Sequence, residues 1–218
     1  MEKPSWRRSL PDLGMVLLLV LFPHYVPLPF YSYALVCFLA LLYYLRRSGE
    51  SLRSLGLQRD GVRPGTVAVG LLSALVWVAF MRWVYGPLIA HFFTVPDYTE
   101  YDFIRGSVQR LAMTLVAAWV VGGFYEEVVF RGFIQSIFEK HLGGRRGAFW
   151  LSAVAASILF GLYHWQQGIF GVVAATLGGL YWSCVLRLLG RNLWRPILSH
   201  ALYDTIALVL IYLGLFNR

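Results

Sequence analysis

Charged side chains are scarce in this chain of 218 residues. Asp, Glu, Lys and Arg make up 14% of it, whereas soluble domains carry about a quarter. Hydrophobic residues make up 58%, and the mean hydropathy is +0.61. This composition excludes an ordinary soluble domain and predicts an integral membrane protein. The length suits one compact bundle, so we expect a single domain over residues 1–218.

Cysteine and acidic residues are also few. Cys37 and Cys184 both fall in apolar segments far apart in the sequence, which argues against a disulfide or a cysteine metal site. Lys and Arg outnumber Asp and Glu by 19 to 11, but they cluster in short connectors and form no basic face. We therefore expect no nucleic-acid partner, and a lipid bilayer as the surroundings.

Seven segments are apolar enough to predict membrane-spanning helices, each of which needs about 20 mostly apolar residues. They are residues 10–27, 28–45, 65–88, 108–138, 148–165, 169–189 and 195–215. Pro23, Pro27 and Pro29 are expected to shorten or bend the first segment. The fourth exceeds one span, so we expect it to continue as an interfacial helix beyond Arg131. The predicted fold is all-α, a polytopic transmembrane helical bundle of about seven spanning helices.

Basic residues alternate between connectors, and this asymmetry predicts the orientation. The N-terminal stretch and the connectors after the second, fourth and sixth segments are basic, whereas the loop before the fourth carries Asp97 and Asp102. The positive-inside rule then places the N-terminus in the cytoplasm. The short N-terminus without a cleavage site, the Arg-rich connectors and the lack of a retention signal favour a prokaryotic plasma (inner) membrane.

Six ionisable residues inside the fourth, fifth and seventh apolar segments are candidates for a shared site. A charged group at the bilayer centre costs about 2.5–3.5 kcal/mol on insertion scales. A chain that keeps six such residues on three segments is most simply explained by one shared polar site within residues 108–215. The six are Glu126, Glu127, Arg131, His164, His200 and Asp204.

Glu127 and Arg131 are four residues apart, so on a helix they share a face and would neutralise each other. Glu126 lies about 100° around the helix from Glu127, which leaves it for another role. The alternative is a purely structural ion-pair network. His164, alone on its segment, is the kind of histidine that is usually a satisfied core residue. His200 and Asp204 also share a face, either as an ordinary hydrogen-bonded pair or as two groups of one cavity.

Taken together, these groups fit a hydrolytic site that activates water. A carboxylate can take a proton from water, a histidine can hold that water, and a donor pair can stabilise the oxyanion that forms. The same groups are also zinc ligands. The zinc-protease patterns HExxH and HxxEH are absent, as is the serine-hydrolase pattern GxSxG.

Three motifs in this chain resemble those of the CPBP (Abi) family of intramembrane proteases, which includes the type II CAAX prenyl endopeptidases. They are Glu126-Glu127-x-x-x-Arg131, Phe160-x-x-x-His164 and His200-x-x-x-Asp204, in the family's order and on separate apolar segments. The resemblance implies that Glu126 is the general base and that His164 helps to hold the water. It also implies that His200 and Asp204 line the oxyanion side, with Glu127 and Arg131 supporting Glu126.

Position 204 departs from the family pattern, because the prenyl endopeptidases generally carry Asn where this chain has Asp204. An ionised Asp cannot donate a hydrogen bond to an oxyanion. It must be protonated, orient His200, or bind a metal. We favour a glutamate-type reaction without a cofactor, and a divalent metal, zinc, is the alternative.

The resemblance implies a membrane-anchored or lipidated polypeptide as substrate. Prenylated tails, bacteriocin or pheromone precursors and C-terminal sorting segments all fit. Two other functions stay open from the residues alone. One is a small proton- or ion-coupled transporter, in which the buried carboxylates and histidines bind the ion. The other is a non-catalytic immunity or scaffold protein of the membrane.

Overall fold

The computed structural model describes residues 6–29, 31–58, 60–93, 99–143, 145–188 and 190–215, and all regular secondary structure in these ranges is helical. Asp97 lies outside the described residues. The helices are α1 (Trp6–Tyr25), α2 (Ser32–Arg47), α3 (Pro64–Phe80), η1 (Met81–Tyr85), α4 (Gly86–Phe92), η2 (Thr99–Ile104), α5 (Val108–Ala117), η3 (Ala118–Glu126), η4 (Val128–Ile134), α6 (Gln135–His141), α7 (Ala148–Tyr163), η5 (Trp165–Gln167), α8 (Gly168–Leu188) and α9 (Trp194–Tyr212). The predicted all-α class is confirmed.

Each of the seven predicted segments coincides with a helical run of the described chain. The third corresponds to one run from α3 to α4, and the fourth to one run from α5 to α6. Pro23 lies within α1, and the helix ends at Tyr25, two residues before the predicted end of the first segment. The fifth segment ends at Tyr163, two residues before its predicted end, and the short turn η5 leads directly into α8.

Three helical runs of the described chain are long and apolar enough to cross a membrane, namely Pro64–Phe92, Val108–His141 and Trp165–Leu188. Ser9–Tyr25 and Ala148–Tyr163 are shorter apolar helices. Large apolar side chains such as Leu72 and Val116 are exposed on these helices. Lipid-facing side chains are expected to be exposed in this way, because hydrocarbon surrounds them instead of water. The chain is an integral membrane protein, and its orientation stays a prediction.

The middle of the fourth run is not an ordinary α-helix. Both η3 and η4 are π-helical, and the N–H of Gln135 donates to the carbonyl of Phe130, five residues back. Such π-helical turns, which are wider than α-helical turns, are rare and often occur at functional sites. The first motif therefore lies in widened turns. The sequence spacing did not predict this, because an apolar segment fits both bonding patterns.

The described chain divides into two compact units, each built from two separate stretches. The first unit holds residues up to Gly61 together with Tyr125–Leu193, and the second holds Val62–Phe124 together with the residues from Trp194 onward. The chain passes from the second unit to the first inside η3. The two units are thus interleaved in sequence and do not follow one another as domains in series.

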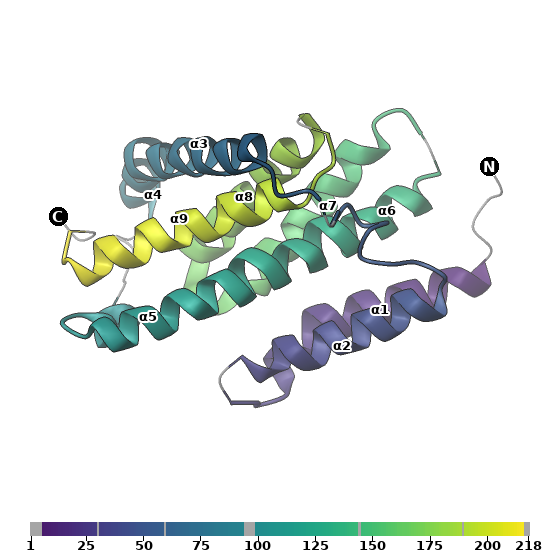
Figure 1. The fold of residues 1–218 in the computed structure, drawn as a ribbon, viewed down its shortest axis with the longest axis horizontal. Helices are drawn as coiled ribbons and strands as arrows, with labels where there is room; N and C mark the ends of the chain where they lie inside the picture. The colour runs from purple at the N-terminus through teal and green to yellow at the C-terminus, as the bar shows by residue number, and fades with distance from the viewer. Residues whose placement is uncertain are drawn as a thin grey trace. The chain divides into compact units, whose positions relative to one another are not determined.

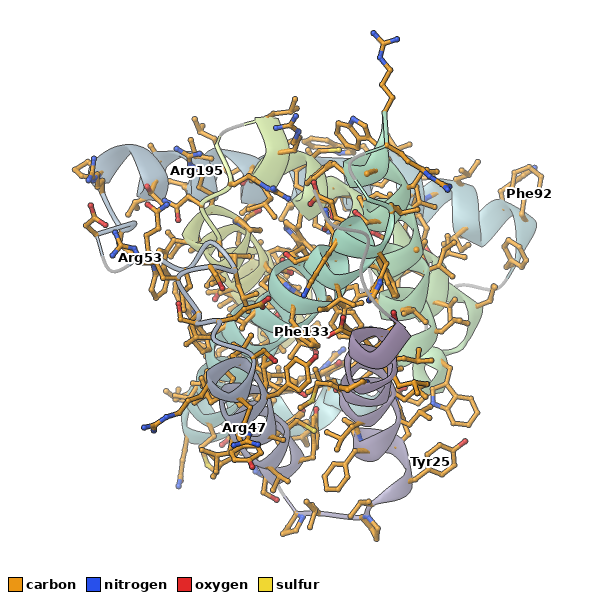
Figure 2. All side chains as sticks on the ribbon, turned by 90° about the vertical axis from the view of Figure 1, so that its right-hand side faces the viewer. Tyr25, Arg47, Arg53, Phe92, Phe133 and Arg195 are labelled. Carbon is orange, nitrogen blue, oxygen red and sulfur yellow. The ribbon has the colours of Figure 1, made fainter. Side chains whose placement is uncertain are left out.

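Within the first unit, α1 and α2 lie side by side as a hairpin, and α7 packs along α8 (Figure 1). The contact between α7 and α8 depends on glycine. A Cβ at Gly161 would lie 1.9 Å from the Oγ1 of Thr176, and one at Gly179 would lie 2.7 Å from the Oγ of Ser157. Figure 2 shows Phe133 within the packed side chains, where it is fully buried, whereas Arg47 points outward.

Within the second unit, α9 packs against α3 and α5. Small residues again allow the close approach. A Cβ at Gly70 on α3 would lie 2.6 Å from the Cβ of Leu198, and one at Gly123 on η3 would lie 2.6 Å from the Cβ of Ala201. These contacts hold the part of α9 that carries the third motif.

Candidate active site

Glu127 and Arg131 form a buried ion pair in the first unit. The Nη1 of Arg131 lies 3.2 Å from the Oε1 of Glu127, and the side chains are 2% and 0% exposed. The guanidinium also lies over two aromatic rings, 4.1 Å from the centre of Phe160 and 5.3 Å from that of Trp182. A cation over an aromatic face is attracted to the ring's negative surface. The pair is therefore fixed by a carboxylate and two rings, and Arg131 is committed to Glu127.

Glu126, the neighbouring carboxylate, faces a histidine instead. Its Oε2 lies 4.0 Å from the Nε2 of His164, and the residue is 7% exposed. This separation is too long for a direct hydrogen bond. The separation does suit one bridging water. If the water oxygen lies about 2.8 Å from both Oε2 and Nε2, the angle at the water oxygen between these two atoms is about 90°. The two hydrogens of a water molecule can satisfy that angle.

His164 is positioned by the end of α7. It follows the last helical residue, and its Nδ1 lies 2.8 Å from the carbonyl oxygen of Phe160. A carbonyl only accepts hydrogen bonds, so Nδ1 carries the hydrogen. In the neutral imidazole, Nε2 then has a lone pair that faces Glu126. This atom can accept a hydrogen bond from water.

Phe160 links the first two motifs physically. Its carbonyl holds His164, its ring packs 4.6 Å from the imidazole, and the same ring lies under Arg131. Trp182 completes the stack on Arg131 and was missed in the sequence. Tryptophan is common in membrane helices, so no local signal distinguishes Trp182 from the others.

His200 and Asp204 form a pair on α9 in the second unit. The Nε2 of His200 lies 3.7 Å from the Oδ2 of Asp204. A Cβ at Gly122 would lie 2.6 Å from that Oδ2, so the Asp204 carboxylate rests against bare backbone of η3. This pair belongs to the second unit, whereas Glu126 and His164 belong to the first. The expectation that all six residues share one site stays a prediction.

The first unit offers fewer metal ligands than a catalytic zinc requires. Glu126 and His164 supply one oxygen and one nitrogen, whereas a catalytic zinc takes three protein ligands. Across the described ranges, no three His, Cys, Asp or Glu side chains gather as a metal site requires. The first unit by itself therefore does not complete a zinc site, and zinc stays the alternative prediction.

The comparisons with known proteins point to one region of the chain. The family model described as "Type II CAAX prenyl endopeptidase Rce1-like" matches residues 108–206. This stretch contains all three motifs. No curated protein and no solved structure matches the chain.

Proposed function

We infer that this chain is an intramembrane endopeptidase. The reason is that over residues 108–206 it belongs to the Rce1-like family of type II CAAX prenyl endopeptidases. The observation that carries the inference is the pairing of Glu126 with His164 at a distance that suits one bridging water. A buried carboxylate and a neutral imidazole that share one water form a minimal site for hydrolysis.

The proposed reaction starts from that water. Glu126 takes one of its protons while the Nε2 of His164 accepts a hydrogen bond from the other. The water oxygen then bonds to the carbonyl carbon of the scissile peptide, and the carbonyl oxygen becomes an oxyanion. When the intermediate collapses, the carbon–nitrogen bond breaks, and Glu126 returns its proton to the leaving nitrogen.

The buried ion pair supports this base without reacting. Arg131 neutralises Glu127, so Glu126 is left as the carboxylate that faces His164. Because Phe160 touches both Arg131 and His164, the ion pair also fixes the end of α7. In this proposal, removal of Arg131 would displace His164 from Glu126.

The pair on α9 is proposed to act on the oxyanion side. Two facts support this role: His200 and Asp204 share one helix face, and Asp204 packs at Gly122, four residues before Glu126 in the chain. An ionised Asp204 cannot donate to an oxyanion, so its proposed role is to orient His200. With its Nε2 turned to Asp204, His200 would supply the hydrogen bond from Nδ1 as an imidazolium, in which both ring nitrogens carry a hydrogen.

The family's description favours a prenylated substrate with a C-terminal CAAX motif, in which the lipid is attached to the cysteine. We propose such a membrane-anchored polypeptide for this chain. The reaction needs no cofactor in this form. A divalent metal remains a separate hypothesis, which the sensitivity of purified protein to strong chelators would test.

The test uses the full chain, reconstituted in lipid vesicles with a farnesylated CAAX peptide. Glu126→Gln keeps the shape of the side chain but removes the base, so turnover should fall at least about 100-fold. The matched control is Glu139→Gln, because Glu139 is an acidic residue of the same helical run whose partner is Arg191, outside the site. It should cleave at the wild-type rate. Cleavage by Glu126→Gln at the wild-type rate would exclude the proposed base.

A further inference from the structure

His164 lies at a corner of the chain, where α7 ends and the short turn η5 begins. Its backbone is no longer helical (φ −100°, ψ 21°), so α7 does not set the direction of the residues that follow. Phe160 holds the imidazole from one side, through its carbonyl and its ring. The position of His164 opposite Glu126 therefore also depends on what holds Tyr163 and Trp165, its two neighbours in the sequence.

One side chain from α1, that of His24, contacts both neighbours of His164. The Nε1 of Trp165 donates to the Nδ1 of His24 across 3.3 Å. The imidazole also meets two rings edge to face, with its centroid 4.9 Å from that of Tyr163 and 6.2 Å from that of Trp165. Both separations fall in the range in which aromatic rings attract each other in this arrangement. His24 thus connects α1 to the residues before and after His164.

The hydrogen bond to Trp165 explains why position 24 holds a histidine. An indole N–H only donates, so the Nδ1 of His24 has the lone pair, and the hydrogen of the neutral ring is on Nε2. Nε2 is buried, and no group among the described residues reaches it with hydrogen-bond geometry. A buried N–H without a partner destabilises the folded state. A phenylalanine would make the same ring contacts without that penalty, so the distinct contribution of His24 is the acceptor that it offers to Trp165.

Trp165 does not need this acceptor for its own stability. It is 62% exposed, so water or a lipid headgroup can accept from its indole N–H when His24 does not. Loss of the hydrogen bond should therefore change the position of the corner more than the stability of the fold. Position matters because the Oε2 of Glu126 and the Nε2 of His164 are 4.0 Å apart, a separation that one water spans. A displacement of about 1 Å at such a site can lower a rate about 100-fold.

We propose that His24 is a positioning residue, which holds Tyr163 and Trp165 so that the Nε2 of His164 stays one water away from Glu126. The proposal rests on the proposed protease function. It extends the site to α1, which lies outside the residues that the family model matches. In this role His24 touches neither the water nor the substrate, and it acts through His164.

The first measurement compares variants of the full chain in reconstituted vesicles with the farnesylated CAAX peptide. His24→Phe keeps a ring against Tyr163 and removes the acceptor, whereas Trp165→Phe removes the donor. Each should lower kcat about 10-fold while KM changes less than about twofold, because the substrate still binds but the water is held at the wrong distance. The double variant should be no slower than either single variant, since both substitutions remove the same hydrogen bond.

The matched control is His91→Phe. His91 also packs edge to face on an aromatic ring, that of Phe92, with centroids 4.9 Å apart, but it belongs to the second unit. It should keep the wild-type kcat.

The second measurement separates the positioning of His164 from a general loosening of the fold. In the His164→Ala background, His24→Phe should not lower the single-turnover rate further, because the side chain that it positions is absent. A general effect on the fold would lower the rate by the same factor in both backgrounds. Rates are measured with enzyme in excess and compared per mole of monodisperse folded protein, so poor expression does not change the comparison.

The proposal would be overturned by a wild-type kcat in either single variant, or by losses that multiply in the double variant. An equal loss from His24→Phe with and without the His164 side chain would also overturn it. Failure of the protease function itself has a different signature, because wild type would then cleave no more peptide than Glu126→Gln. If wild type cleaves, Glu126→Gln is inactive and His24→Phe matches wild type, only the role of His24 is wrong.

Discussion

Replacing Arg131 with Met should test how the buried ion pair contributes to the fold. Met keeps a long side chain over Phe160 and Trp182, but it leaves the Glu127 carboxylate buried with no cation. Both side chains of the native pair are shielded from solvent, so water cannot solvate the Glu127 carboxylate once Arg131 is gone. The uncompensated charge of Glu127 should therefore account for most of the loss in stability.

The expected loss in the free energy of unfolding follows from the burial of the ion pair. Breaking a buried pair by removing one partner costs about 3–5 kcal/mol, because the other charge stays uncompensated. Loss of the two cation–ring contacts adds about 0.5–2 kcal/mol. Removing both charges, in Glu127→Gln/Arg131→Met, should recover most of this loss, since no buried charge remains. The single and double variants should therefore differ by about 3 kcal/mol in the free energy of unfolding.

The assay is reversible unfolding of the full chain in mixed micelles by a denaturing detergent, followed by tryptophan fluorescence. Wild type, both single variants and the double variant together form a double-mutant cycle. A double variant no more stable than Arg131→Met would refute the reasoning, because it would show that lost packing and not the stranded charge sets the cost. Arg187→Met is the matched control, since Arg187 also lies over an aromatic ring, that of Phe149, but at 5.4 Å.

Two further substitutions test the close contacts made by glycine. Gly161→Ala should destabilise the chain by at least about 1–3 kcal/mol in the same assay, because the new Cβ would lie 2.6 Å from the backbone oxygen of Val172. The control is Gly14→Ala at an exposed position of α1, which should be neutral or slightly stabilising. Equal stability of these two variants would contradict the tight α7–α8 contact. Gly122→Ala should lower peptide cleavage at least about 10-fold, because its Cβ would displace the Asp204 carboxylate, which would disturb the proposed orientation of His200. Undiminished cleavage would show that this contact does not position the pair.

The histidines show what the sequence did not predict in the first unit. In the sequence, His24 lies near the end of the first apolar segment and His141 lies among the basic residues of a connector. In the structure, the Nε1 of Trp165 donates to the Nδ1 of His24 across 3.3 Å, and the Nε2 of His141 lies 2.9 Å from the Oδ2 of Asp12. Asp12, which is buried, also accepts a hydrogen bond from the hydroxyl of Tyr44. These contacts join residues more than 30 positions apart, so no local pattern indicates them.

The sequence by itself determined the helical class, the seven apolar segments, and the four-residue spacing that pairs Glu127 with Arg131. These features depend on hydropathy and on helical periodicity, which are local properties of the chain. The tertiary structure alone decided that the first motif lies in π-helical turns and that Phe160 connects Arg131 to His164. These features depend on which helices pack together and how closely, and that is set by side-chain volume at glycines such as Gly161 and Gly179, not by the order of residues along one helix.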